Sequence, residues 1–375
     1  MRGVVPRAAS ARSAMTSLPR YVHVFATFGA GGAQIRAVQL MAHLGPRAHH
    51  VVVAMDGRTE AAQQLAPGLS VAFESAPPKG SFLATVRAQR AFLRAQRPDL
   101  VLTYNWGAIE TAAAARSLRM PLVHHEDGFG PEEVVRRFRR RSWMRALVLR
   151  SAEVVVPSTV LQGIAAREWH LPSRRVHLLV NGVDLARFRP RTEALLPTHA
   201  MLGTVGGLRG EKDHSCLLRA LLQLPPAVTL RSVGGGALAE PLRAEANALG
   251  VASRVDFHGP VADTAPCYRT FDLFVLSSRT EQMPIAMLEA MATGLPVVAT
   301  DVGDVRAMLP AEAADCIVPK EDPAALAAAI ARLLADPVRA ERLGAANRAL
   351  AEQRYPAAAC LDRFLQLYER VARRG

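Results

Sequence analysis

Two glutamates eight positions apart, Glu281 and Glu289, lie in a segment that otherwise consists mainly of small and apolar residues. From Pro284 to Glu289 a helix would rise by roughly 8 Å, about the reach between the two ends of a nucleoside-diphosphate sugar across its pyrophosphate. A carboxylate accepts hydrogen bonds from two hydroxyls, so one glutamate could hold a ribose and the other a hexose. A capping glutamate and a surface glutamate are the alternative. A charge among the apolar neighbours of Glu289, however, needs a partner or access to solvent.

Two cations precede these glutamates. Arg209 and Lys212 follow a glycine turn at Gly206-Gly207, where an arginine fork and a lysine point charge could clamp a diphosphate. Two solvated side chains on a polar loop are the alternative. Another glycine turn, Gly31-Gly32, opens a predicted helix whose N-terminus favours phosphate, although a tight turn without a ligand explains it equally well. No turn fits the dinucleotide-binding or P-loop pattern, which argues against a nicotinamide dehydrogenase and excludes a P-loop NTPase.

A strand, a loop and a helix must position the two glutamates. Residues 273–276 are predicted as a buried strand, the helix ends at Gly294 before Pro296, and residues 297–299 form the next strand. Such a βαβ unit places its loop at the carboxyl end of a strand, where open α/β sheets bind ligands. The same alternation runs through both halves of the chain and predicts two parallel sheets with helices on both faces.

The 375 residues exceed what one hydrophobic core normally serves, so we expect two domains. The predicted bounds are a disordered basic tail or an over-long start at residues 1–20, a first domain at 21–186, a linker at 187–199, a second domain at 200–355 and a C-terminal helix at 356–375 that crosses back to the first domain.

Arginine dominates the charge. The formal net charge is +13 and the pI about 10.6, while lysine occurs only at Lys79, Lys212 and Lys320. A GC-rich genome would explain most of the arginine, and an anionic partner such as a phosphorylated ligand, an anionic lipid or nucleic acid is the functional alternative. The cysteines are widely spaced, so neither a zinc site nor a disulfide framework is indicated, and a reducing cytosol fits. No apolar run is long enough to predict a transmembrane helix.

The segment around the glutamates resembles the Glu-x7-Glu motif of family 4 retaining glycosyltransferases, which have the GT-B fold. Other features of that family follow in the same order, and the resemblance covers roughly residues 20–370. They are Gly31-Gly32, Pro157-Ser158, Asn181-Gly182-Val183-Asp184, Val205-Gly206, Glu211-Lys212 and Val233-Gly234-Gly235-Gly236. The sequence Thr280-Glu281-Gln282-Met283-Pro284 is similar to that found in a branch of the family associated with exopolysaccharide and exosortase-linked gene clusters.

The resemblance implies two Rossmann-like domains that face each other across a cleft, and it implies a role for each candidate residue. Glu289 would bind the ribose, Glu281 the transferred sugar, and Arg209 and Lys212 the leaving diphosphate. The remaining implied donor-site residues are Gly31 and Gly32, which would approach the phosphates from the other domain, Gln282 and Met283, whose main-chain N–H groups would add to the cradle, and His125 as a catalytic residue.

The chain departs from the family at three places. The family's arginine after the strand glycine is replaced by Gly207, so Arg209 would substitute or Lys212 would act alone. The glycine and aromatic residue that usually follow the first glutamate are Gln282 and Met283. The first-domain histidine is ambiguous, because His124, His125 and Asp127 all follow one strand; we assign His125, and we expect His124 to be structural.

A basic segment at residues 136–150 interleaves arginines with Phe138, Trp143 and Met144. It predicts an amphipathic helix of the kind that lies on anionic membranes, and the alternative is a helix with one solvated face and one face in the core. No nucleic-acid-binding motif accompanies the charge, so we expect no nucleic-acid partner.

These observations favour a retaining, metal-independent hexosyltransferase without a cofactor. It would use a nucleotide sugar and a saccharide or lipid-linked acceptor in bacterial polysaccharide synthesis. We expect it in the cytoplasm, and the basic segment adds the expectation of a peripheral position on the inner face of the membrane. No Asp-x-Asp occurs that could hold a metal. A sugar epimerase of the same fold, a non-catalytic sugar-binding relative and a module that binds acidic polymers are the alternatives.

Overall fold

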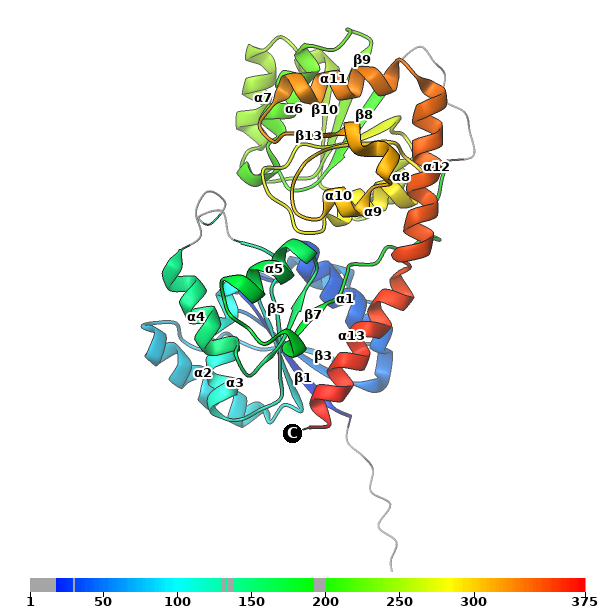
Figure 1. Ribbon diagram of the computed structural model, residues 1–375. Helices are drawn as coiled ribbons and strands as arrows, with labels where there is room; N and C mark the ends of the chain where they lie inside the picture. The colour runs from blue at the N-terminus through cyan, green and yellow to red at the C-terminus, as the bar shows by residue number, and fades with distance from the viewer. Residues whose placement is uncertain (1–17, 30, 130–132, 134–137, 192–199, 375) are drawn as a thin grey trace, which may run out of the picture.

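The chain forms two domains, each built on one parallel sheet (Figure 1). The computed structural model describes residues 18–29, 31–129, 133, 138–191 and 200–374. Most of the predicted tail and of the predicted linker lies outside these residues, and the predicted domain bounds stay a prediction.

The first domain carries a sheet of seven strands in the order β3-β2-β1-β4-β5-β6-β7. Its strands are β1 (Arg20–Phe25), β2 (His49–Ala54), β3 (Val71–Phe73), β4 (Leu100–Tyr104), β5 (Leu122–His125), β6 (Glu153–Val156) and β7 (Val176–Leu178). Its helices are α1 (Gly32–Leu44), α2 (Phe82–Gln96), α3 (Ile109–Ser117), α4 (Arg139–Leu149) and α5 (Thr159–Arg167). The near-continuous apolar strands are buried because helices cover both faces of the sheet.

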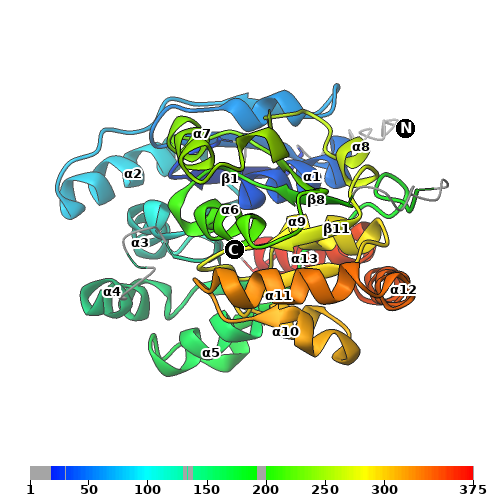
Figure 2. The ribbon, with the colours of Figure 1, turned by 90° about the horizontal axis from the view of Figure 1, so that it is seen from above.

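The second domain carries a sheet of six strands in the order β10-β9-β8-β11-β12-β13. Its strands are β8 (Ala200–Val205), β9 (Val228–Val233), β10 (Val255–Gly259), β11 (Leu273–Leu276), β12 (Val297–Thr300) and β13 (Ile317–Val318). Its helices are α6 (His214–Leu222), α7 (Ala239–Ala248), α8 (Ala265–Tyr268), α9 (Ile285–Ala292), α10 (Val305–Met308), α11 (Pro323–Leu334) and α12 (Pro337–Arg354). Figure 2 shows helices on both sides of the central strands β8 and β11. Both sheets confirm the predicted α/β architecture.

The last helix, α13 (Ala357–Ala372), leaves the second domain and packs against the first, as predicted (Figure 1). Its side chains Phe364 and Tyr368 are buried in the core of the first domain with Tyr21 and Phe25. The two chain crossings also pair with each other, because Val183 N–H donates to the Tyr355 carbonyl at 2.8 Å. The chain therefore passes between the domains twice, and α13 completes the core of the first domain.

Candidate functional site

The loops that follow β8 and β9 pack directly against each other. Gly234 has a φ of +142°, and a Cβ there would lie 1.9 Å from the Gly206 carbonyl oxygen. A Cβ on Gly236 would likewise meet the Leu208 carbonyl oxygen at 2.4 Å. Only glycine fits such backbone contacts. The close packing of two loops therefore explains the turn at Gly234–Gly236 without a ligand.

Lys212 and Glu281 form an ion pair where the loops after β8 and β11 meet. Lys212 Nζ lies 2.5 Å from Glu281 Oε1, and the Ser278 hydroxyl donates to the same oxygen at 2.8 Å. The Glu281 side chain is 11% exposed and that of Lys212 is 22% exposed. Residues separated by 69 positions are thus brought together at the carboxyl edge of the sheet, and both charged groups keep some access to solvent.

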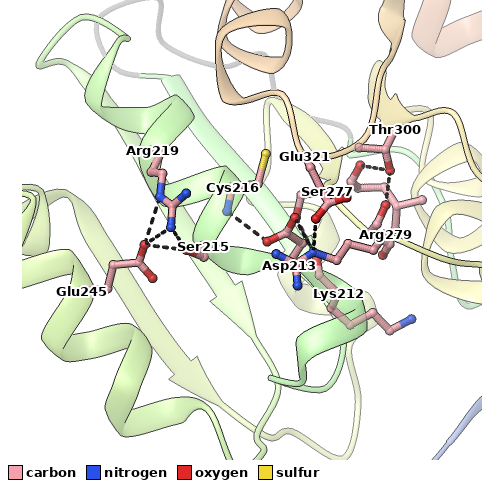
Figure 3. Close-up of polar contacts among 12 residues, drawn as sticks. Lys212, Asp213, Ser215, Cys216, Arg219, Glu245, Ser277, Arg279, Thr300 and Glu321 are labelled. Carbon is pink, nitrogen blue, oxygen red and sulfur yellow. Dashed lines mark hydrogen bonds and ion pairs between the residues drawn. The ribbon is translucent and has the colours of Figure 1, made fainter. Parts of the chain in front are cut away.

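The main chain of Lys212 is fixed by its neighbours. The Ser277 hydroxyl donates to the Lys212 carbonyl at 3.0 Å. The next residue, Asp213, caps α6 by accepting a hydrogen bond from the Cys216 N–H. Arg279 Nε lies 3.1 Å from both Asp213 Oδ2 and Glu321 Oε1, and the Lys212 side chain extends away from this cluster (Figure 3). These contacts fix the main chain of the loop that carries the Lys212 side chain.

Arg209 lies over the glycine that stands where the family has its arginine. A Cβ on Gly207 would lie 3.1 Å from Arg209 Nε, so the guanidinium stem occupies the space beside that glycine. Arg209 is 57% exposed and pairs with Glu211 at 3.0 Å. The side chain is therefore close to the expected position but tethered only at the surface.

Glu289 is half-buried on α9 and has a partner. The Tyr268 hydroxyl donates to Glu289 Oε2 at 2.7 Å and is also within 2.9 Å of the Ala286 carbonyl. Burial raises the pKa of Glu289 to about 7, although Tyr268 and Arg187 both oppose the shift. The charge among apolar residues is thus partly stabilised, as the sequence requires. Tyr268 carried no sequence signal for this contact, because it lies on the separate short helix α8.

Gly32, Gln282 and Met283 meet at the junction of the domains. A Cβ on Gly32 would lie 3.3 Å from Ile285 Cδ1, at the first turn of α9. The Ser158 hydroxyl donates to Gln282 Oε1 at 2.7 Å, and the Asn181 amide donates to the Met283 carbonyl at 3.1 Å. Gln282 and Met283, which depart from the family pattern, therefore join the two domains through their side chain and main chain. Gly31 is the N-cap residue of α1 beside this junction.

Asp304 caps a helix of the other domain. Its carboxylate accepts hydrogen bonds from the Thr159 N–H at 2.6 Å, the Thr159 hydroxyl at 2.9 Å and the Val160 N–H at 3.1 Å. Its own N–H donates to the Gln282 carbonyl at 2.9 Å. A carboxylate at a helix N-terminus is favoured by unpaired N–H groups and by the helix dipole. Asp304 therefore links the Glu281–Gln282 loop to α5, a contact that sequence reasoning missed because the partners lie 145 residues apart.

His125, predicted as a catalytic residue, is enclosed within the first domain. His125 is completely buried, its ring stacks on Tyr104, and its Nε2 lies 2.8 Å from the Tyr368 hydroxyl on α13. Burial, together with the nearby charge of Arg36, holds the pKa of His125 well below its usual range. In this arrangement the imidazole is neutral and packs in the core, and the catalytic role of His125 stays a prediction.

Arg36 and Asp127 form an ion pair next to His125, whose Nδ1 lies 3.5 Å from Arg36 Nη2. Arg36 donates to both carboxylate oxygens of Asp127, at 2.6 and 2.9 Å, and to Asn181 Oδ1 at 3.1 Å. Asn181 in turn holds Met283 of the second domain. His124, expected to be structural, is buried with its Nδ1 2.8 Å from the Thr103 hydroxyl. Asp127, which follows β5, is thus linked through Arg36 and Asn181 to the second domain.

Within the described residues, no group of three or more His, Cys, Asp or Glu side chains is placed to hold a metal ion. In the same part of the chain, no helix is both long and apolar enough to cross a bilayer. The four cysteines are free and buried. The expected independence of metal and cofactor stays a prediction.

Comparison with known proteins places this geometry in a family. The model "Glycosyltransferase Family 4" matches residues 30–187, and the model "Glycosyl transferases group 1" matches residues 199–336. The D-inositol 3-phosphate glycosyltransferase of Thermobispora bispora is 30% identical over 71% of this chain and 69% of its own length. The lipopolysaccharide core biosynthesis mannosyltransferase LpcC of Rhizobium leguminosarum is 34% identical over 44% of this chain, and the chain spans about half of its length.

A solved structure shows the same fold. Anabaena Alr3699/HepE in complex with UDP-glucose superimposes with a TM-score of 0.79 at 20% identity, over 93% of this chain and 98% of HepE. The two family models each match one half of the chain, and each half contains one of the two sheets. The chain therefore belongs to the family 4 glycosyltransferases and has the GT-B fold.

Proposed function

We propose that this protein is a retaining hexosyltransferase that needs no divalent metal. It would move a hexose from a nucleoside-diphosphate sugar to a saccharide or lipid-linked acceptor in bacterial polysaccharide synthesis. The observation that carries the proposal is the Lys212–Glu281 ion pair at the carboxyl edge of the second sheet, because a cation lies there beside a carboxylate that could hold sugar hydroxyls.

Two relatives support the donor and acceptor classes. HepE was solved with UDP-glucose, and the Rhizobium protein is named as a mannosyltransferase of the lipopolysaccharide core. Each name refers to a hexose, glucose in the first and mannose in the second. The second name also indicates a saccharide acceptor, the lipopolysaccharide core. An exopolysaccharide product and a cytoplasmic site of action, as expected from the sequence, belong to the same proposal.

In the proposed reaction, the bond between the anomeric carbon and the diphosphate oxygen breaks. The acceptor oxygen bonds to the same face of that carbon, and its proton passes to the leaving diphosphate. Lys212 and Arg209 would balance the charge that develops on the diphosphate. Glu281 would hold hydroxyls of the transferred sugar, and Glu289 those of the ribose.

The domain junction would complete the donor site. Main-chain N–H groups of Gly31, Gly32, Gln282 and Met283 are proposed to face the phosphates, since α1 and α9 both begin at this junction. Closure of the two domains around the donor would exclude water from the reaction.

The test is a panel of nucleotide sugars incubated with the protein, with and without membrane extract, while release of nucleoside diphosphate is followed. We expect release that depends on the extract. Lys212→Ala should lower kcat by about 100-fold or more, because it removes a preorganised charge beside the leaving group. Lys79→Ala, which removes an exposed lysine of the first domain, is the matched control and should keep full activity.

The other outcomes identify the alternatives. Interconversion of two nucleotide sugars without an acceptor would mean an epimerase. Nucleotide binding without release would mean a non-catalytic sugar-binding relative. If the protein neither binds any nucleotide sugar nor releases a nucleoside diphosphate, the proposed enzyme activity is refuted.

We also propose that α4 contacts an anionic membrane surface. The structure separates its arginines into two groups: Arg145 is completely buried beside Glu126, and Arg141 donates to Glu133. The exposed group comprises Arg139, Arg140 and Arg150 and accompanies three exposed apolar side chains, Phe138, Trp143 and Leu147. Residues 134–137, part of the predicted basic segment, lie outside the described residues.

An exposed tryptophan beside arginines is typical of helices that lie in the headgroup region. Co-sedimentation with vesicles that contain phosphatidylglycerol tests this surface. We expect Trp143→Ala to weaken binding severalfold and Leu83→Ala, which removes another exposed apolar side chain on α2, to leave it nearly unchanged. Equal binding by all three proteins would refute the assignment.

A further inference from the structure

A pocket of about 340 Å³ opens at the end of the first domain that lies away from the second domain. Its walls come from the C-terminal end of α3, the starts of β5 and β6, the residue before β7, and the last turn of α13. The C-terminus, which lies beside this pocket, is at the far end of the molecule in Figure 1. The pocket is therefore at the amino edge of the sheet, whereas the proposed donor site is at the carboxyl edge of the other sheet.

Four arginines line this pocket: Arg116, Arg119, Arg175 and Arg374. Two of them are anchored by the main chain. Arg175 Nη1 donates to the Ser151 carbonyl at 3.0 Å, and Arg116 Nη1 donates to the Leu147 carbonyl. Anchoring fixes the direction of a guanidinium and lowers the entropy lost when it binds a ligand.

Of the residues that the structure describes, Glu153 alone contributes a carboxylate to the pocket lining. It is largely engaged, because Arg175 Nη1 lies 2.9 Å from its Oε1 and His177 Nε2 lies 2.7 Å from its Oε2. Arg374 Nη1 is 3.6 Å from the same carboxylate and is 64% exposed. Among the described residues, Arg119 has no ion-pair partner. The lining thus carries more positive charge than Glu153 can balance.

Several arginines lining one concave surface suit a phosphate group, which accepts bidentate hydrogen bonds from arginine. We propose that this pocket binds a phosphate-bearing ligand, separately from the donor site. The ligand is either a soluble phosphomonoester or the headgroup of an anionic lipid. The lipid source would agree with the exposed Leu147 and Trp143 on α4, because Arg116 ties the pocket to the Leu147 carbonyl.

The test compares the double variant Arg119→Glu/Arg374→Glu with the wild type. Both side chains are exposed, so the fold should tolerate the change. Binding of glycerol 3-phosphate is measured by calorimetry, and binding of vesicles with 30% phosphatidic acid by co-sedimentation. The charge-matched control is Arg94→Glu/Arg97→Glu, at exposed positions at the end of α2.

We expect the pocket variant to lose at least tenfold in affinity for one or both probes and the control variant to lose less than threefold. Loss for glycerol 3-phosphate identifies a soluble ligand, and loss for vesicles alone identifies a lipid headgroup. Equal losses in the two variants, no loss in the pocket variant, or no binding of either probe by the wild type would overturn the proposal. Binding of UDP, measured by calorimetry on the same preparations, should remain unchanged in the pocket variant, so failure of this site and failure of the proposed donor site are distinguishable.

Discussion

Nucleotide binding should weaken as the pH falls through 7, because Glu289 titrates there. Burial raises the pKa of this carboxyl to about 7. A carboxylate accepts hydrogen bonds from two hydroxyls, whereas a carboxylic acid offers one acceptor fewer and must place its own proton. If Glu289 holds the ribose as proposed, the protonated form binds the nucleotide less tightly.

The size of the effect follows from the pKa. With a pKa of about 7, the ionised fraction of Glu289 falls from about 0.9 at pH 8 to about 0.1 at pH 6. If only the ionised form makes the ribose contact, the affinity falls by up to about tenfold over this range. That corresponds to about 1.4 kcal/mol of binding free energy.

Calorimetric titration with UDP at pH 6, 7 and 8 and constant ionic strength measures this change. The phosphate of UDP titrates in the same range, so the control is Glu289→Gln, in which only the phosphate contributes. The wild type should therefore lose up to about tenfold more affinity between pH 8 and pH 6 than the variant does.

Tyr268→Phe provides a second, directional check. The Tyr268 hydroxyl donates to the Glu289 carboxylate and lowers its pKa. Without that hydrogen bond the pKa should rise, and the loss of affinity should begin at a higher pH. The reasoning is refuted if the wild type and Glu289→Gln show the same pH dependence, or if Tyr268→Phe moves the midpoint downward.

Three further predictions concern the junction and the buried charges. Asp304→Ala removes three hydrogen bonds to α5, so it should cost about 1 kcal/mol and increase the radius of gyration of the nucleotide-free protein in small-angle scattering; an unchanged scattering curve would contradict this role. His50 and His214 have pKa values lowered from 6.5 to about 4 by burial, so the unfolded state binds more protons below pH 6.5, and these two histidines should account for about 3 kcal/mol of the stability that urea unfolding shows to be lost between pH 7.5 and pH 5.5; a loss that His50→Gln/His214→Gln does not reduce would argue against these two histidines. Arg145→Ala leaves Glu126 buried without its arginine, with only the longer contact to His124 remaining, and should cost about 3–5 kcal/mol; calorimetry would detect this as a fall in Tm of about 10 °C, whereas Arg145→Met/Glu126→Gln should cost much less.

The candidate site was predictable where it depends on local chain geometry. The spacing of Glu281 and Glu289 around the start of α9 follows from one loop and one helix. Lys212 also lies at the carboxyl edge of the same sheet, because it follows the neighbouring strand β8. In parallel sheets, adjacent strands end at the same edge, so residues far apart in sequence are brought together by a regular rule.

The burial of His125 has a different origin. The strand end was located correctly, but α13 covers the imidazole, and the contact with Tyr368 spans 243 residues. Nothing in residues 122–127 indicates which side chain a distant helix will cover. The same limit applies to α4, where Glu126 and Glu133 turn two of the arginines into structural residues.

The sequence by itself determined the alternation of strands and helices, the glycine turns and the carboxyl-edge position of Glu281, Glu289 and Lys212, because these depend on periodicity and on short-range backbone sterics. Only the tertiary structure decided which polar groups are enclosed, how Gln282 and Asp304 join the domains, and why the Glu289 carboxyl titrates near pH 7. Burial and electrostatics depend on every group that packs around an atom, and those groups come from distant parts of the chain.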